Sequence, residues 1–393
     1  MNFQSIQITR KLIAAVTATV LLISALFSSM PLFLEGVQAS ADTNNFLRCA
    51  TAMLGQSGIE KAIASNLVSP WCRSYTGFLM ILTPIIYLSG DHWSLTLTSF
   101  NILFHAIAIT LCFSLIYQFT KEIWWALATA ALLILSVDIL IRVHWPLADS
   151  FFFMMATISF FGVALTVLRP ESRKLAIGAI FAVVLAGLSK PHGLIVLSIG
   201  LPAILLRARL ANLGVRTALI IFGLTVFLIF ASFLFISWII TPDYQPISFE
   251  VAIMKEFLMT GQVIEGVYST YNSDTDRFFG RFFTMCERFF TFFSFFPIHW
   301  SQRHIALSAL FFIPSYFGLF FCWTALATRR LEPKFNGLIL LITTWMLGFA
   351  TFAGWFDVSY EFRYRLPIMG LFAIGGTLGF YLLRPKTIPN DSL

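Results

Sequence analysis

Apolar stretches of about 20 residues recur along this 393-residue chain, and they constrain its fold more than any other feature. About 20 residues of α-helix, rising 1.5 Å each, cross the ~30 Å hydrocarbon core of a bilayer. Only 11% of the residues are charged, against about 25% in soluble domains, and 58% are hydrophobic. The chain is therefore expected to be an all-α polytopic membrane protein. Its net charge of +7 is spread over short loops, which argues against nucleic-acid binding.

The apolar pattern predicts about ten membrane-spanning helices in a single integral-membrane domain, residues 1–393, with no separate soluble domain. Residues 174–206 are too long for one span, because such a helix would extend about 50 Å. Pro191 interrupts this stretch, so we expect a hairpin of two short helices with Lys190 and His192 at its turn. The expected spans are residues 12–33, 97–118, 123–141, 150–168, 174–188, 193–206, 217–240, 306–327, 337–356 and 366–383.

The first apolar stretch has two interpretations. A basic start and the sequence Ala39-Ser40-Ala41 after the stretch are typical of a cleaved signal peptide. The apolar run from Leu12 to Leu34, however, exceeds the ~7–15 residues of a signal-peptide core. This length favours an uncleaved first membrane helix, and under either interpretation the residues after Glu35 emerge outside.

The basic residues predict which loops are cytoplasmic. Of the 26 Lys and Arg residues, 14 fall in loops on one side of this arrangement. Cytoplasmic loops are enriched in Lys and Arg, so that side, with both chain termini, is expected to lie inside. The other side carries two long outer loops, residues 35–96 and 241–305.

Each outer loop contains a segment that we expect to lie at the membrane surface. In the first loop, residues 75–90 are apolar but too short, and interrupted by proline, to span the bilayer. The second loop ends in a phenylalanine-rich segment whose Arg277, Arg281 and Arg288 share one helical face. This basic stripe is expected to contact either anionic lipid headgroups or a ligand.

The five cysteines leave one pairing open. Cys49 and Cys72 lie in the same outer loop and could form a disulfide in an oxidising compartment. Cys286 is a third candidate on that side, so the sequence does not settle the pairing. Cys112 and Cys322 lie within apolar spans, where cysteine is usually a small core residue.

Ionisable residues gather next to the outer ends of the predicted spans. Such groups are costly at membrane depth unless they pair or face water, so they mark candidate functional cavities. Carboxylates beside cations suit transfer of a group from a lipid phosphate, in which a base activates the acceptor and cations stabilise the departing phosphate. Asp138 lies inside a predicted span, and His105 is the polar residue whose position within a span is most similar to it. The residues at the ends are Asp42, Asp91, Arg142, Asp149, Lys190, Asp357, Glu361, Arg363 and Arg365.

The order of five segments resembles that of GT-C superfamily glycosyltransferases. The resemblance is to the protein-mannosyltransferase and aminoarabinose-transferase-like (RgtA/B/C/D-like) group. It implies a GT-C-like fold with two long outer loops that carry interfacial helices. The segments are "ADTNNFLRCATAMLG", "SPWCRSYTGFLMIL", "HWPLADSFFFMMA", "GLSKPHGL" and "EFRYRLPIMGL".

The resemblance implies roles for individual residues. Asp42 matches the family's first-loop aspartate, the general base of an inverting displacement, and Asp149 matches a second acidic position that assists the base or holds a metal. Both could instead be helix N-caps. Lys190 matches a lysine near the lipid phosphate, although a lysine that extends to the interface is the plainer interpretation. Arg363 is expected to bind the carrier phosphate, with Glu361 or Asp357 as its ion-pair partner, although a simple interfacial ion cluster is the alternative. His192 and Arg365 are further candidates at the donor phosphate, with Tyr364 and Arg142 in support.

Some features depart from the family or compete with it. Phe46 stands where tyrosine is common, and Ser69-Pro70 replaces a Pro-Pro pair, which puts acceptor contacts and subfamily in doubt. His144 and Asp149 match the H-x-x-x-x-D pattern of glycerolipid acyltransferases, but companion motifs are not found. A transporter or flippase for a lipid-linked or small polar solute is the alternative from another class.

The sequence thus predicts a membrane glycosyltransferase that uses a polyprenyl-phosphate sugar donor. The acceptor is a lipid, glycan or protein, membrane lipids surround the enzyme, and no nucleic acid takes part. The expected location is the bacterial plasma (inner) membrane, with the active site facing outside. No cofactor is implied with certainty, and a divalent metal is left open.

Overall fold

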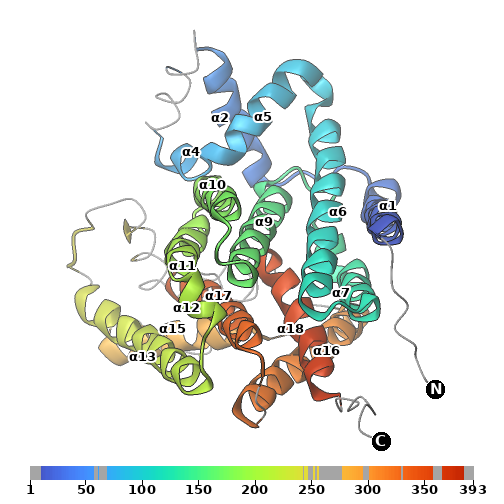
Figure 1. The fold of residues 1–393 in the computed structure, drawn as a ribbon. Coiled ribbons are helices and arrows are strands. Elements are labelled where there is room, and N and C mark those ends of the chain that lie inside the picture. Colours follow the sequence, from blue (N-terminus) through green and yellow to red (C-terminus); the bar gives the residue numbers. More distant parts are fainter. Residues whose placement is uncertain are drawn as a thin grey trace, which may run out of the picture.

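The structure is a computed structural model. It describes residues 10–56, 61, 69–241, 243–246, 251–252, 255, 277–294, 301–328, 331–356 and 365–384. Within these residues the secondary structure is helical and contains no strand, as the composition predicts. The helices form a bundle, and a smaller group of helices stands above it in Figure 1.

The helices have the following bounds. They are α1 (Arg10–Glu35), α2 (Ala41–Leu54), α4 (Pro70–Arg73), α5 (Thr76–Ser89), η1 (Gly90–His92), α6 (Trp93–Thr120), α7 (Ile123–Ile134), α8 (Val137–Leu140), α9 (Ala148–Leu168), α10 (Arg173–Ser189), α11 (Gly193–Leu205), α12 (Arg207–Ala211), α13 (Val215–Ile239), α15 (Phe278–Thr291), α16 (Gln302–Thr328), α17 (Pro333–Phe356), η3 (Leu366–Ile368) and α18 (Met369–Leu383).

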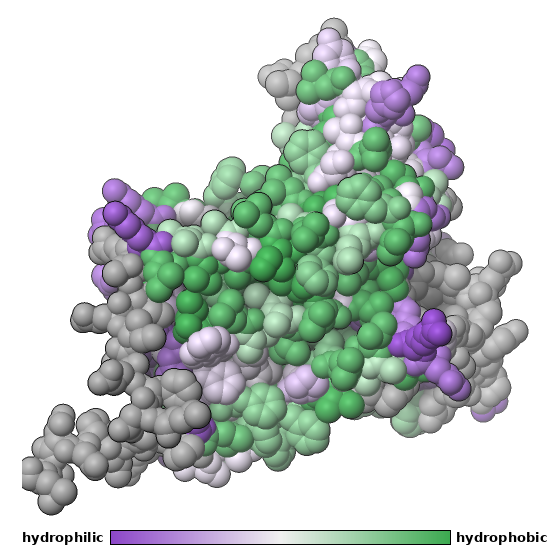
Figure 2. Space-filling model, turned by 90° about the vertical axis from the view of Figure 1, so that its right-hand side faces the viewer, coloured by the Kyte–Doolittle hydropathy of each residue, from purple (hydrophilic) through white to green (hydrophobic). Residues whose placement is uncertain are grey.

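Seven helical segments among the described residues are long and apolar enough to cross a membrane. They support a multi-pass membrane protein, and the count of ten spans stays a prediction. Figure 2 shows a broad apolar face with hydrophilic residues at its edges and on the part that projects above it. The seven are Lys11–Glu35, Thr76–Thr120, Ala148–Leu168, Val215–Ile239, Gln302–Thr328, Pro333–Trp355 and Leu366–Leu383.

Three of the predicted spans, residues 123–141, 174–188 and 193–206, correspond to helices shorter than the ~20 residues that cross a bilayer. Residues 123–141 do not form one helix: α7 ends at Ile134, and the four-residue α8 follows an extended Ser136. The prediction of a single span there is wrong, because the extended backbone of Ser136 interrupts the helix before Asp138. The hairpin at Pro191 is confirmed, since α10 ends at Ser189 and α11 begins at Gly193.

Loops predicted to share the cytoplasmic side do lie together. Arg207 Nε donates to the carbonyl oxygen of Pro170 at 2.8 Å, and Asn336 Nδ2 donates to that of Leu213 at 2.7 Å. Arg384, after α18, pairs with Glu122, before α7. These contacts collect the loops at one end of the bundle, and α2, α4 and α5 lie at the other end (Figure 1).

The group formed by α2, α4 and α5, here called the cap, is held by a disulfide. Cys49 and Cys72 are bonded with their Cα atoms 5.8 Å apart, and Cys286 remains a free cysteine. The 14-residue α5 packs on α2 and on the end of α10. A Cβ on Gly77 of α5 would lie 3.0 Å from the carbonyl oxygen of Leu188, so the two helices are in backbone contact.

Amphipathic helix α15 forms where predicted, but its basic stripe faces inward. Arg281 and Arg288 are 4% and 1% exposed, whereas Phe279 is 65% exposed. Arg281 Nε and Nη2 donate to the carbonyl oxygen of Ser237 at the end of α13, at 3.0 and 2.8 Å. The expectation that these two arginines lie against lipid headgroups is therefore wrong. Arg277 is exposed.

The disulfide should contribute measurably to the stability of the cap. Cys49→Ser releases a loop with a sequence separation of 23 residues. Loop-closure entropy then predicts a loss of about 3 kcal/mol in the free energy of unfolding. Thermal unfolding of the purified protein in detergent measures this, with Cys286→Ser as the matched control. Equal melting temperatures for the Cys49→Ser variant and the unaltered protein would contradict the prediction.

A second prediction concerns the close packing of α16 and α18. A Cβ on Gly318 would overlap the carbonyl group of Gly376, whereas a Cβ on Gly223 would meet nothing within 4 Å. Gly318→Ala is therefore expected to lower stability by about 1–3 kcal/mol, because neither backbone can move aside. Gly223→Ala should be neutral or slightly stabilising in thermal unfolding, since alanine favours helix. Two variants of equal stability would contradict this packing.

Candidate functional site

The candidate site lies where α1 ends, α2 and α9 begin, and α10 ends. The backbone N–H of Gln38, just before α2, donates to the carbonyl oxygen of His144, just before α9, at 3.1 Å. His144 Nε2 also lies 3.2 Å from Glu35 Oε2 at the end of α1. These contacts hold the connection between α1 and α2, which leads to Asp42, against the connection between α8 and α9, which leads to Asp149.

Aromatic contacts join the cap to the start of α9. Phe46, one turn after Asp42, has its ring centroid 5.0 Å from that of Phe78 on α5. Phe78 in turn lies 6.1 Å, centroid to centroid, from Phe151 in the first turn of α9. Phe46 is thus a buried core residue of the cap. Asp42 and Asp149 belong to helix starts that share this cluster.

A buried ion pair connects Asp149 with Lys190. Asp149 comes from the first turn of α9 and Lys190 from the turn between α10 and α11, and their side chains are 7% and 6% exposed. Lys190 therefore points into the protein, and the interpretation that it extends to the interface is wrong. A charge at this depth requires a partner, and Asp149 supplies it.

His192 lies beside this pair in an aromatic environment. It occupies the N-cap position of α11 and is 7% exposed. Its ring centroid is 4.3 Å from that of Phe352 on α17 and 6.4 Å from that of Phe152, one turn after Asp149. The predicted residues Asp149, Lys190 and His192 are thus brought together by α9, α10, α11 and α17.

Neither aspartate is a helix N-cap. Ser40 caps α2: Thr43 N donates to Ser40 Oγ at 3.3 Å, and Ser40 N donates to Thr43 Oγ1 at 3.0 Å. Asp42 stands in the first turn and is half-buried, and Asp149 stands in the first turn of α9 after Leu147 at the N-cap. The capping interpretation of both residues is wrong. A carboxylate in a first turn is still favoured by the helix dipole.

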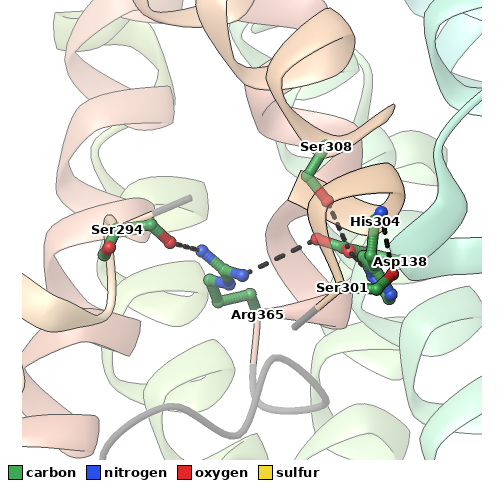
Figure 3. Close-up of polar contacts among 6 residues, drawn as sticks. All are labelled: Asp138, Ser294, Ser301, His304, Ser308 and Arg365. Carbon is green, nitrogen blue, oxygen red and sulfur yellow. Dashed lines mark hydrogen bonds and ion pairs between the residues drawn. The ribbon is translucent and has the colours of Figure 1, made fainter. Parts of the chain in front are cut away.

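A second buried cluster surrounds Asp138 (Figure 3). Ser308 Oγ donates to Asp138 Oδ1 at 3.2 Å, and His304 Nε2 lies 3.4 Å from the same oxygen. Arg365 Nη2 is 3.6 Å from Asp138 Oδ2. Arg365 also donates from Nη1 to the carbonyl oxygen of Ser294. The cluster joins α8, the start of α16, the segment after α15 and the start of η3.

Arg365 was predicted to bind the donor phosphate, without a stated ion-pair partner. Asp357, Glu361, Arg363 and Tyr364 lie outside the described residues. In the structure the counter-charge of Arg365 is Asp138, and its guanidinium carbon is 4.8 Å from the ring centroid of Phe312. His304 and Ser308 were missed by sequence reasoning. The only signal for the cluster was a carboxylate within an apolar stretch.

The connection before α9 is fixed by buried polar residues of α6. Asn101 Nδ2 donates to the carbonyl oxygens of Val143 and Trp145, at 3.2 and 2.8 Å. His105 Nε2 is 3.0 Å from Ser150 Oγ, so His105 binds the start of α9. Arg142 is half-buried and stacks over Trp145, 5.7 Å from the ring centroid. Asn101 was also missed.

The two residues of the acyltransferase-like pattern have separate partners. His144 pairs with Glu35, whereas Asp149 pairs with Lys190. Burial lowers the pKa of His144, an effect that Glu35 opposes and Arg142 reinforces. Each residue therefore holds a different segment in place. Among the described residues, no group of three or more His, Cys, Asp or Glu side chains is arranged to hold a metal ion.

Comparisons with protein-family models, with curated proteins and with solved structures gave no match for this chain. The resemblance to GT-C glycosyltransferases stays a prediction from the residues quoted above.

Removing one partner of the buried pair should destabilise the protein more than removing both charges. Lys190→Met leaves the carboxylate of Asp149 buried without its ammonium partner, which is expected to destabilise the protein by about 3–5 kcal/mol. The double variant Asp149→Asn with Lys190→Met should recover a large part of that loss. Thermal unfolding in detergent checks this, with Lys174→Met on the exposed start of α10 as the control. A double variant less stable than Lys190→Met would contradict the pairing.

Proposed function

We propose that this protein is a membrane glycosyltransferase that moves a sugar from a polyprenyl-phosphate donor to a lipid, glycan or protein acceptor. One observation supports it most: the described interior of the protein holds more buried cations than buried carboxylates. Among the described residues, the buried Lys and Arg side chains outnumber the buried Asp and Glu side chains by four to two. The cations are Lys190, Arg281, Arg288 and Arg365, and the carboxylates are Asp138 and Asp149.

These cations suit a phosphate leaving group. When the bond between the anomeric carbon and the phosphate oxygen breaks, the oxygen keeps the electron pair and gains negative charge. Buried cations stabilise that charge more strongly than exposed ones, because little water screens them. Lys190 and Arg365 are already oriented by Asp149 and Asp138, so they need little rearrangement to bind a phosphate.

Asp42 is the residue that we assign as base. It lies half-buried at the start of α2, next to the connection that reaches α9, so an acceptor from solvent can approach it. The carboxylate takes the proton of the acceptor hydroxyl or amine while that atom attacks the anomeric carbon. Direct displacement inverts the configuration at this carbon. The proton stays on Asp42 until solvent removes it.

The surroundings of the site suit a lipid-linked donor. The apolar face of Figure 2 can hold a polyprenyl chain in the bilayer while its phosphate lies at the end of the helices. The disulfide of the cap favours an oxidising compartment, which for a bacterial plasma membrane is the outer side. We therefore propose that the active site faces outside.

Sugar transfer by membranes supplied with labelled polyprenyl-phosphate sugars tests this function. Asp42→Asn is expected to lower the transfer rate by about 10²–10⁴-fold, the usual contribution of a general base. The matched control is Asp91→Asn, the same change at an exposed aspartate of η1, which should transfer sugar at close to the unaltered rate. An Asp42→Asn variant that inserts normally and keeps full transfer would refute the assignment. Translocation of the labelled lipid without sugar transfer would favour the transporter alternative.

A further inference from the structure

We propose that Asp138 is a positioning residue. Its carboxylate holds Arg365 ready to bind the phosphate of the lipid-linked donor. This inference rests on the proposed function. It adds α8 and the start of α16 to a site that the sequence assigned to α2, α9, α10 and residues near 363. The four residues that carry it are Asp138, His304, Ser308 and Arg365.

The cluster is too deeply buried to be an incidental surface ion pair. The side chains of Arg365 and Asp138 are 5% and 3% exposed. Burying each charge alone would cost several kcal/mol, so the fold must bring the two together. Arg365 directly precedes η3, and η3 packs on α9, the helix that begins with Asp149. The position of Arg365 is therefore tied to the element that carries the other buried ion pair.

The two oxygens of Asp138 have different surroundings. Oδ1 accepts a hydrogen bond from Ser308 and lies against His304, which fixes the orientation of the carboxylate. Oδ2 is buried, makes no hydrogen bond to any described residue and lies 3.6 Å from Arg365 Nη2, beyond the usual range of an N–H···O bond. The attraction between the two residues is therefore mainly the attraction of opposite charges.

This loose pairing suits an arginine that must bind a second anion. A guanidinium has five N–H donors in one plane, and a phosphate accepts two of them side by side. Arg365 can turn part of that plane to a phosphate without breaking a direct hydrogen bond to Asp138. Meanwhile the charge of Asp138 and the carbonyl oxygen of Ser294 keep the guanidinium in place. Asp138 therefore acts through Arg365 and needs no contact with the substrate.

Binding of farnesyl phosphate to the purified protein tests the proposal, with farnesol as the control ligand that lacks the phosphate. We expect farnesyl phosphate to bind more tightly than farnesol. Asp138→Asn should weaken binding of farnesyl phosphate by about tenfold and leave farnesol binding unchanged, as a mispositioned charge-assisted contact predicts. Arg365→Gln should weaken it at least as much. The control variant is Glu122→Gln, which breaks the ion pair to Arg384 at the opposite end.

The decisive result is the double variant. If Asp138 acts through Arg365, Asp138→Asn changes binding less than twofold once Arg365 is already glutamine, because interacting residues are not additive. The same tenfold loss in both backgrounds would overturn the proposal, and so would equal binding of farnesyl phosphate and farnesol. Ser308→Ala is a milder second variant, and we expect about a threefold loss that also disappears in the Arg365→Gln background.

These outcomes separate the inference from the proposed function. A protein that binds farnesyl phosphate through Arg365 and Asp138 but transfers no sugar would keep the inference and overturn the glycosyltransferase. If the protein transfers sugar but Asp138→Asn binds farnesyl phosphate as tightly as the unaltered protein, the glycosyltransferase is kept and the inference is overturned.

Discussion

The need to neutralise buried charge at the end of a membrane bundle organises this protein. A lysine or arginine that leaves water for a low-dielectric interior is stable there only with a partner. Asp149 with Lys190, and Asp138 with Arg365, meet this need, and each pair joins segments far apart in the chain. The first pair ties α9 to the turn between α10 and α11. The second ties α8 and α16 to the start of η3. The helix packing and the candidate site therefore depend on the same interactions.

Hydrogen bonds around these pairs extend the constraint to the chain between helices. Asn101 holds the carbonyl groups of residues 143 and 145, and the backbone of Gln38 binds that of His144. The connection before α9 therefore has its polar groups satisfied by α6 and by the chain after α1. In a bilayer an unsatisfied backbone group costs several kcal/mol, so such connections are stable only where neighbouring segments supply partners. This explains how a half-buried Asp42 and a buried Asp149 come to lie at helix starts that are joined.

The sequence predicted helices and turns better than it predicted partners. Apolar length and Pro191 were sufficient for the hairpin, because both act locally along the chain. The break before α8 was not predicted, since Asp138 meets Ser308 and Arg365, residues more than 160 positions away. The capping residue Ser40 could have been recognised from its hydroxyl three positions before Thr43. Which helix faces meet could not be predicted, because lipid tails and helix interfaces are equally apolar.

Helix α15 turns its arginine face toward the protein interior and its phenylalanine face outward, the opposite of an amphipathic helix in a soluble protein. In water the apolar face of an amphipathic helix turns inward, whereas the sequence of α15 predicts a helix at the membrane surface whose basic stripe contacts lipid headgroups or a ligand. At a membrane the surrounding lipid is apolar, so Phe279 is exposed while Arg281 and Arg288 are buried. That arrangement is stable only if the interior at this end offers acceptors such as the carbonyl oxygen of Ser237. A cation-rich interior beside an apolar outer face would suit the lipid-linked phosphate that we propose as the donor.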